Sequence, residues 1–182
     1  MRVIAGSAKG TKLLSPAGKD TRPTTDRAKQ KLFDTLRTLV EQPALALDLF
    51  SGSGALGIEA LSRGAGRVVF IEKNRAAAEI IRKNLEKTHL SQKSEIFVND
   101  AFLYLNKLCT LKYDLIFADP PYQSGYTQKL INIIISRELL HPNGLLVVED
   151  TAEAKQKVTE GLTLIRTKVS GYTAHYIFEK SE

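Results

Sequence analysis

From Ala44 onward the sequence alternates between short apolar segments and longer amphipathic ones, and this alternation limits the possible folds more than any other feature. The apolar segments predict strands at residues 44–50, 67–72, 94–100, 113–119 and 143–150. The amphipathic segments predict helices at residues 54–64, 74–87, 101–108 and 124–139, with a helical turn at 152–158. The strand cores VVFI, LIFA and LLVV are apolar at every position, which is typical of parallel strands covered on both faces.

The last part of the chain follows a different pattern. Residues 161–169 and 172–180 flank a Ser-Gly turn and predict an antiparallel hairpin. Five strand–helix units closed by such a hairpin predict a doubly wound, Rossmann-like α/β fold with a seven-stranded, mostly parallel sheet. Ahead of it, residues 1–14 predict a short β-hairpin and residues 26–40 a helix. Ligands of such sheets bind outside the carboxyl ends of the strands.

Length and composition exclude several classes of protein. A chain of 182 residues suits one domain. No apolar run approaches the roughly 20 residues of a membrane span, and the amino terminus lacks the apolar core of a signal peptide. Cys109 is the single cysteine, and no Cys/His cluster has zinc-ligand spacing, so we expect a cytoplasmic protein without a metal or a membrane partner. His89, His141 and His175 have no acid at a telling spacing and are expected at the surface or in packing.

The positive charge is concentrated in the first 40 residues. This segment has nine Lys/Arg and three acids, and its excess of six positive charges equals the net charge of +6 of the whole chain. A basic segment attached to a neutral body predicts a polyanion-binding face, with an ordinary solvated surface as the alternative.

A glycine loop follows the first strand of the alternating series. Gly52, Gly54 and Gly57 form a G-x-G-x-x-G pattern, in which the backbone turns tightly and approaches a ligand at the amino end of the next helix. Glu72 ends the second strand, where its carboxylate can accept hydrogen bonds from two ribose hydroxyls. On these features alone, a dinucleotide-dependent oxidoreductase fits as well as any other nucleotide-binding protein.

Two acids favour a different nucleoside. Asp48 precedes the glycine loop, where a carboxylate repels pyrophosphate but tolerates the sulfonium and ammonium groups of S-adenosylmethionine. Asp100 follows the third strand, where it can accept a hydrogen bond from the exocyclic amine of an adenine. Asp48 as a loop cap and Asp100 as a helix N-cap are the alternatives. Phe50 either lines the cofactor site or packs in the core.

The fourth strand ends in the sequence DPPY. Its two prolines carry no N–H and fix their own φ, so they form a rigid end to the strand. The Asp119 side chain and the Pro120 carbonyl can accept the two hydrogens of a planar amine, which draws its nitrogen toward tetrahedral geometry for attack on a methyl group. Tyr122 can stack on the flat base that carries this amine.

These motifs together resemble a known class of enzymes. DLFSGSGALGIEA, IEKN, NDA and DPPY resemble class I S-adenosylmethionine methyltransferases that act on exocyclic or amide nitrogens. RVIAGSAKGTKL and RPTTDRAKQKLFDTL resemble one narrower family, the RsmD-type small-subunit ribosomal RNA guanine-N2-methyltransferases. The resemblance covers nearly the whole chain and implies methylation of N2 of one guanine in 16S rRNA, on an assembling small ribosomal subunit.

The resemblance also assigns roles to residues. The cofactor would be held by Asp48, Phe50, Gly52, Gly54, Glu72, Lys73, Asp100 and Ala101. The guanine amine would be held by Asp119, Pro120 and Tyr122. RNA would be contacted by Arg2, Lys9, Lys12, Arg22 and Arg27, although the Arg22-Pro23-Thr24 segment can instead close over the cofactor. We therefore expect a basic, RNA-facing hairpin and helix at residues 1–42 and a catalytic core at residues 43–182 of one domain.

Other functions stay open at this point. DPPY suits any planar amine, so the same cofactor could serve adenine-N6 in DNA or a glutamine amide in a protein. A nucleotide-binding fold that binds RNA without catalysis is the third possibility.

Overall fold

A seven-stranded sheet forms the centre of the computed structural model, which describes residues 1–16, 26–40, 42–121, 125–154 and 160–181. The strands are β1 (Leu45–Leu49), β2 (Arg67–Ile71), β3 (Ser94–Phe97), β4 (Tyr113–Ala118), β5 (Leu140–Thr151), β6 (Leu162–Ser170) and β7 (Thr173–Lys180). The helices are α1 (Asp26–Leu36), α2 (Ala55–Ser62), α3 (Arg75–Lys87), α4 (Ala101–Leu103) and α5 (Tyr126–Ser136), with a 3₁₀ turn at Ser91–Lys93 and a π-helical turn at Tyr104–Leu108.

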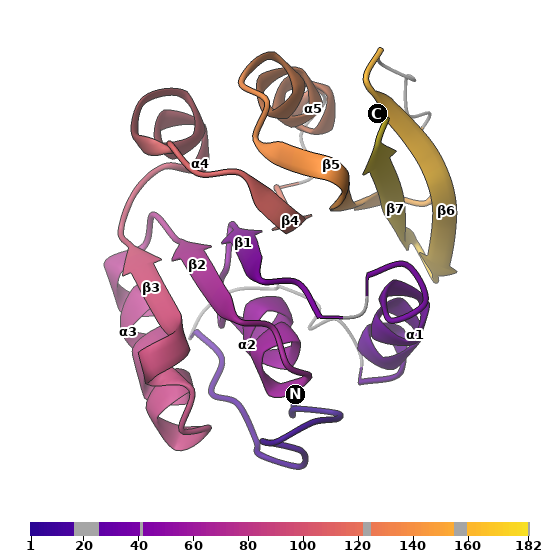
Figure 1. Cartoon of the computed structure of the whole chain (residues 1–182). Coiled ribbons are helices and arrows are strands. Elements are labelled where there is room, and N and C mark those ends of the chain that lie inside the picture. The colour runs from indigo at the N-terminus through magenta and orange to yellow at the C-terminus, as the bar shows by residue number, and fades with distance from the viewer. Residues whose placement is uncertain (17–25, 41, 122–124, 155–159, 182) are drawn as a thin grey trace.

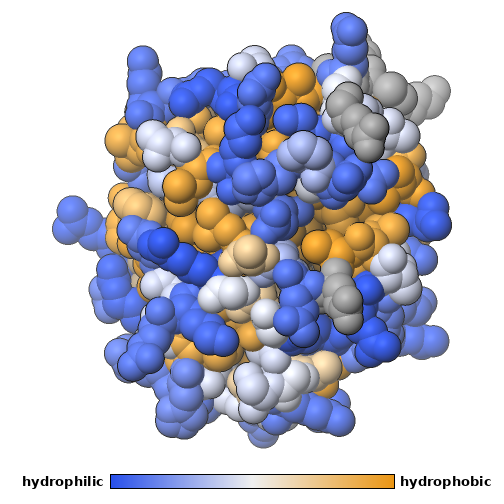
Figure 2. Space-filling model, in the orientation of Figure 1, coloured by the Kyte–Doolittle hydropathy of each residue, from blue (hydrophilic) through white to orange (hydrophobic). Residues whose placement is uncertain are grey.

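Helices cover both faces of the sheet, as the continuously apolar strands predicted. In Figure 1, α1, α2 and α3 lie below the sheet, while α4 and α5 lie above it. Successive residues of β1 enter two separate apolar clusters. Ala46 belongs to the cluster of α1, α2 and α3, and Leu47 belongs to that of α4 and α5. Figure 2 shows the same view of the surface, with apolar side chains in a band at the level of the sheet and polar ones over the helices.

The strand order locates the crevice in which a ligand would bind. The order is β3-β2-β1-β4-β5-β7-β6, with β1 to β5 parallel. Strands are therefore added outward in one direction from β1 to β3 and in the other direction from β4 to β5, so the strand order reverses between β1 and β4. Ligands of doubly wound sheets bind at the carboxyl ends of the strands at such a reversal. The predicted fold class is confirmed, and the loops after β1 and β4 meet at this edge.

The predicted carboxyl-terminal hairpin is also confirmed. β7 pairs antiparallel with β6 and inserts between β6 and β5, at the right of the sheet in Figure 1. The apolar side chains of β7 enter both clusters, so the hairpin is part of the core. Among the described residues, no helix is long and apolar enough to cross a membrane.

The amino-terminal segment lies against α2 instead of projecting from the body. The predicted hairpin forms around an antiparallel bridge between Arg2 and Lys12, and backbone hydrogen bonds of 3.0 Å join Val3 N–H to the Thr11 carbonyl and Leu13 N–H to the Met1 carbonyl. Gly6 approaches the end of α2 so closely that an added Cβ would lie 1.7 Å from the carbonyl oxygen of Ser62. The side chain of Asn84 on α3 bonds both backbone groups of Leu14, at 2.8 and 3.0 Å. This segment is therefore fixed to two helices of the core.

A buried ion-pair network holds the same segment on its inner side. Glu59 of α2 accepts hydrogen bonds from the backbone N–H groups of Ile4 (2.8 Å) and Ala5 (3.0 Å). The Lys29 ammonium lies 3.0 Å from Glu59, and both side chains are fully buried. The Arg63 guanidinium lies 2.7 Å from the other carboxylate oxygen. One carboxylate thus connects the amino-terminal segment, α1 and α2.

Two elements differ from the sequence-based expectation. The helix expected at residues 101–108 has one α-helical turn followed by a π-helical turn, and the N–H of Cys109 donates to the carbonyl of Tyr104 at 2.8 Å. β5 begins at Leu140, three residues before the expected start, because Leu140 pairs with Tyr113 ahead of a register shift. The helical turn expected at 152–158 lies largely outside the described residues.

Candidate active site

The glycine loop has the backbone conformation that its residue types require. Gly52 and Gly54 have φ of 56° and 76°, in the left-handed region that favours glycine. Gly57 serves packing instead, since a Cβ there would lie 2.3 Å from the ring of Phe70 on β2. The loop is therefore shaped for close approach to a ligand, and α2 is held tightly against the sheet.

Glu72 fixes the far side of this loop. Its carboxylate is buried and accepts hydrogen bonds from the N–H groups of Gly52 and Asn74, both at 2.8 Å. Each carboxylate oxygen has a second lone pair, so the group can also accept from a pair of hydroxyls. Lys73, the next residue, is exposed.

Asp48 is a buried carboxylate with little to neutralise it. One oxygen accepts a hydrogen bond from the N–H of Gly57 at 2.9 Å, and the residue is 3% exposed. Burial is the largest cause that raises the pKa of Asp48 to about 8; the negative charges of Asp119 and Glu72 act in the same direction, and the hydrogen bond from the Gly57 N–H opposes them. A positively charged ligand at this edge would relieve the repulsion, whereas a phosphate would increase it.

Asp100, Ala101 and Phe50 complete the β1–β3 side of the crevice. Asp100 is exposed, and its side chain caps the following helix by accepting from the N–H of Leu103 at 3.0 Å. Ala101 is buried beside it. Phe50 is half-buried with φ of 56°, and its ring meets that of Phe102 edge-on at 6.0 Å. Phe50 thus packs on the core cluster, while its strained backbone lies in the glycine loop.

Asp119 and Pro120 lie directly after β4, across the reversal point from the glycine loop. β4 pairs with β1 up to Ala118 and Leu49, so Asp119 leaves the sheet at the same edge as Asp48. Asp119 is exposed and Pro120 is buried, which suits an accessible acceptor beside a rigid backbone. Tyr122 lies outside the described residues.

The structure divides the cations of the amino-terminal segment into two groups. Lys9, Lys12 and Arg27 are exposed, and Arg2 is exposed but forms an ion pair with Asp26 at 2.9 Å. Lys29 is buried against Glu59, so it cannot belong to a polyanion-binding face. A lysine within a basic segment is predicted at the surface, and nothing in the sequence indicated that Lys29 is buried. Arg22 lies outside the described residues.

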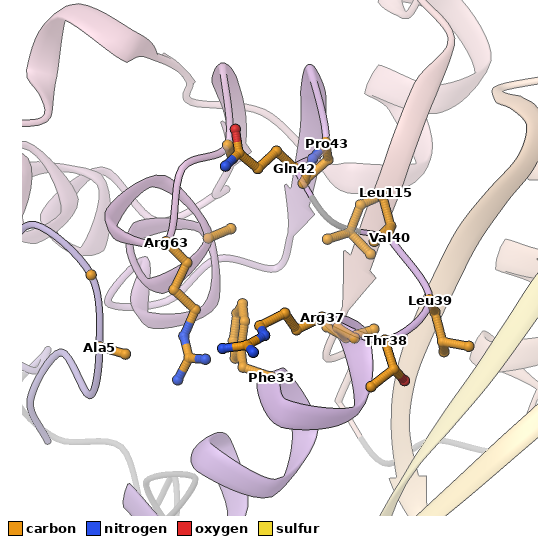
Figure 3. Close-up of a pocket in the computed structure, with 14 residues that line it drawn as sticks. Ala5, Phe33, Arg37, Thr38, Leu39, Val40, Gln42, Pro43, Arg63 and Leu115 are labelled. Atoms are coloured by element: carbon orange, nitrogen blue, oxygen red, sulfur yellow. The ribbon is translucent and has the colours of Figure 1, made fainter.

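A pocket of about 650 Å³ opens at the opposite end of the strands (Figure 3). Its lining includes Phe33, Arg37, Arg63 and Leu115. Leu115 precedes Asp119 by four residues of β4, or roughly 13 Å along an extended strand. Arg63 is already paired with Glu59 and stands over the ring of Phe33. This pocket is therefore separate from the carboxyl-edge site.

The fold and the carboxyl-edge residues define a class of protein: the sheet and its helices form the Rossmann-like fold of methyltransferases. The solved structure of yhhF from Escherichia coli superimposes with a TM-score of 0.87 at 34% identity, covering 100% of this chain and 98% of that one.

The chain belongs to the family described as "Conserved hypothetical protein 95", whose model matches residues 1–179. YlbH of Bacillus subtilis is 36% identical over an alignment of 183 positions that covers 99% of each chain. Ribosomal RNA small subunit methyltransferase D of Escherichia coli K12 is 34% identical over 181 residues, covering 99% of this chain and 90% of that protein. The RsmD-type resemblance drawn from the motifs is confirmed.

Proposed function

We propose that this chain is an S-adenosylmethionine-dependent methyltransferase that modifies N2 of a guanine in 16S ribosomal RNA. One observation carries the proposal. The buried carboxylate of Asp48, which has no cation beside it in the described part of the chain, lies at the same edge of the sheet as Asp119 and Pro120, on the other side of the reversal in strand order. The names of the relatives support rRNA of the small subunit as the substrate.

The residues after β1, β2 and β3 fit this cofactor. Asp48 would face its cationic part, Glu72 its ribose hydroxyls and Asp100 its adenine amine, while Gly52 and Gly54 allow close backbone approach. The cofactor supplies an electrophilic methyl group when bound. Phe50, Lys73 and Ala101 would line the same side. A dinucleotide fits less well, because its pyrophosphate would lie next to the buried charge of Asp48.

The residues after β4 would activate the substrate amine. The lone pair of an exocyclic amine is delocalised into the purine, so the nitrogen is a poor nucleophile. Asp119 and the Pro120 carbonyl would accept its two hydrogens and stabilise the positive charge that develops on the nitrogen. Tyr122 would stack on the base. A base must leave its stack to reach this edge, which favours a loop or an exposed strand of an assembling small subunit in the cytoplasm.

The basic amino-terminal segment would bind the RNA backbone. Exposed Lys9, Lys12 and Arg27 are available for phosphates, and Arg2 would join them if its ion pair with Asp26 opens. Arg22 would contact RNA or close over the cofactor. The same DPPY residues would suit DNA adenine-N6 or a glutamine amide, but no observation on this structure favours either.

Transfer of labelled methyl groups tests the proposal. The protein is incubated with tritiated S-adenosylmethionine and, in separate reactions, small ribosomal subunits, naked 16S rRNA, duplex DNA and a release-factor protein. We expect label only with the ribosomal substrates, with N2-methylguanine as the product by mass spectrometry. Label confined to DNA or protein would refute the proposed substrate, and binding of RNA without any transfer would refute the enzyme.

A further inference from the structure

We propose that the pocket at the amino ends of the strands binds an unstacked nucleotide of the RNA substrate and holds its phosphate between the guanidinium groups of Arg37 and Arg63. This inference rests on the proposed activity toward ribosomal RNA and adds a second RNA contact, at the opposite end of the sheet from the methyl-transfer site. Neither the sequence motifs nor the named relatives assign a role to this pocket.

The pocket lies where three strands begin. Pro43 precedes β1, Ala65 precedes β2, and Leu115 lies near the start of β4. Ala5 and Gly6 also line it, so the basic amino-terminal segment forms part of its wall. The volume of about 650 Å³ lies within the range of about 300–1,000 Å³ that is typical of small-molecule sites. The pocket is therefore large enough for a nucleotide.

Two arginines from different helices meet in this pocket. Arg63 follows α2, and its guanidinium carbon lies 5.0 Å from the centre of the Phe33 ring. Arg37 follows α1 and lies one helical turn after Phe33, since its N–H donates to the Phe33 carbonyl at 3.0 Å. Side chains four residues apart on a helix are neighbours, so Arg37 emerges beside the same ring. Figure 3 shows both guanidinium groups next to Phe33.

Neither guanidinium is fully used within the described part of the chain. Nε of Arg63 donates to Glu59 at 2.7 Å, and Nη1 lies 3.8 Å from Asp34. Nη2 of Arg63 is buried and makes no hydrogen bond there. The side chain of Arg37 is exposed and forms no ion pair with an acid of the described residues. An N–H group buried without an acceptor is costly, and a phosphate oxygen near Nη2 would satisfy it.

The charge balance beside the pocket also favours an anion. The contact between α1 and α2 includes two acids and three cations, namely Asp34, Glu59, Lys29, Arg37 and Arg63. Three positive and two negative charges leave an excess of one positive charge. Arginine suits phosphate in particular, because its planar guanidinium donates to two oxygens at once. The acids at the carboxyl edge would repel a phosphate, so the RNA backbone needs contacts away from that edge.

The rest of the pocket suits a base. A phosphate fills only part of the volume, and other walls are formed by the apolar side chains of Leu36, Leu39, Val40 and Leu115. The amide of Gln42, which can donate and accept hydrogen bonds, lines the pocket as well. Proteins that recognise single-stranded RNA commonly hold unstacked bases on such surfaces and bond their edges. This nucleotide is not the target guanosine, because the pocket and the methyl-transfer site lie at opposite ends of β4.

Filter binding of naked 16S rRNA to the protein and its arginine variants tests the inference. Arg37→Gln removes an exposed cation and leaves the pair of Arg63 with Glu59 intact, so the fold should be kept. We expect the affinity to fall about five- to eightfold at 0.1 M salt, and the slope of log affinity against log salt to fall by about 0.7–0.9, as the loss of one phosphate contact implies. Arg37→Lys keeps the charge and should retain the wild-type slope.

Two further variants complete the series. Arg63→Lys can still pair with Glu59 but lacks Nη2, and it should also lower the affinity for RNA. Arg166→Gln is the matched control, because Arg166 is an exposed arginine of β6 that bonds the carbonyl of Ile165 and does not line the pocket. Its affinity and slope should equal those of the wild type.

Isothermal titration calorimetry with free adenosine 5′-monophosphate distinguishes the two sources of a phosphate. If Arg37→Gln weakens binding of this nucleotide and leaves the affinity for RNA unchanged, the pocket serves a free nucleotide and the inference is refuted. An unchanged RNA affinity in Arg37→Gln or in Arg63→Lys refutes it as well, as does an equal loss in Arg166→Gln. The proposed function fails separately, if the wild-type protein transfers no methyl group to ribosomal substrates, because filter binding does not depend on transfer.

Discussion

Glu59 on α2 and Asp48 on β1 are two buried carboxylates that both contact α2, and their surroundings differ. Glu59 is held between Lys29 and Arg63 and accepts two backbone N–H groups. Asp48 accepts one backbone N–H and has the acids Asp119 and Glu72 for neighbours. The first carboxylate is neutralised by the protein itself, so its role is to hold the amino-terminal segment in place. The contacts of Asp48 in the described part of the chain include no cation, and we propose that a ligand neutralises it.

The largest loss of stability is expected at Glu59. Glu59→Gln keeps the shape of the side chain but leaves the Lys29 ammonium buried without a counter-charge. We expect the free energy of unfolding to fall by about 3–5 kcal/mol, measured by urea denaturation. Glu79→Gln, which removes an exposed ion pair with Arg82, should change it by less than about 1 kcal/mol. Equal losses in the two variants would contradict the assignment of Glu59 as the structural carboxylate.

Asp119 should show the reverse behaviour, with a large effect on activity and little on stability. Asp119→Ala removes one acceptor for the substrate amine, and we expect kcat for methyl transfer to fall by about 10²–10³. The free energy of unfolding should change by less than about 0.5 kcal/mol, because the side chain is exposed. A variant that retains wild-type kcat would remove Asp119 from the reaction.

The stability of the ligand-free protein should depend on pH through Asp48. Its folded-state pKa of about 8 lies above the ordinary value of 3.8 for an aspartate, so the folded state binds more protons between these values and stability falls as the pH rises through this window. Asp48→Asn should therefore match the wild type near pH 4 and exceed it by roughly 5 kcal/mol at pH 8, because a gap of about four pKa units corresponds to about 1.4 kcal/mol per unit. Urea denaturation across this range measures the difference, and a constant offset would show that the charge of Asp48 is not responsible.

The affinity for the cofactor should depend on the ionisation of Asp48 as well. A cation stabilises the ionised form of Asp48, so affinity for S-adenosylmethionine should rise as the pH approaches 8 from below. In Asp48→Asn the affinity should be weaker and nearly independent of pH. Isothermal titration calorimetry at pH 6 and pH 8 gives both values, and a parallel pH response in the two proteins would contradict the proposed contact.

The smallest effects are expected on the outer surface of the amino-terminal segment. Lys9→Ala and Lys12→Ala should each reduce the slope of log affinity for rRNA against log salt by about 1, without changing the cofactor affinity. Exposed Lys93, in the turn before β3, serves as the control, and Lys93→Ala should leave the slope unchanged. Filter binding at several salt concentrations tests this, and no change in any variant would place the RNA elsewhere.

The sequence predicts the sheet and most of the site because both depend on local patterns. Apolar runs predict strands, and side chains just after parallel strands must meet at one edge. The ion pair of Lys29 with Glu59 could not be foreseen, since it joins residues 30 positions apart and a buried lysine has no local signature. The same holds for His175, which was expected at the surface or in packing and lies buried against Glu149 through pairing of β5 with β7.

The π-helical turn after α4 shows a different limit. The spacing of apolar residues in 101–108 fits an ordinary helix, and it does not encode which carbonyl the N–H of Cys109 selects. That choice accompanies a contact between the hydroxyls of Tyr104 and Tyr113, 3.1 Å apart, across the core. The π-helical turn therefore depends on packing between distant parts of the chain, which a local sequence pattern does not describe.

The position of β7 between β5 and β6 affects how the protein folds during synthesis. β6 leaves the ribosome first, yet it has no partner strand in the sheet until β7 follows. A hairpin closes within about 1–10 μs, and β7 is the strand of this hairpin that docks on β5. Until then the edge of β5 exposes unpaired backbone groups to other nascent chains. A chain whose hairpin has not yet docked therefore has an exposed edge strand that can pair with other chains.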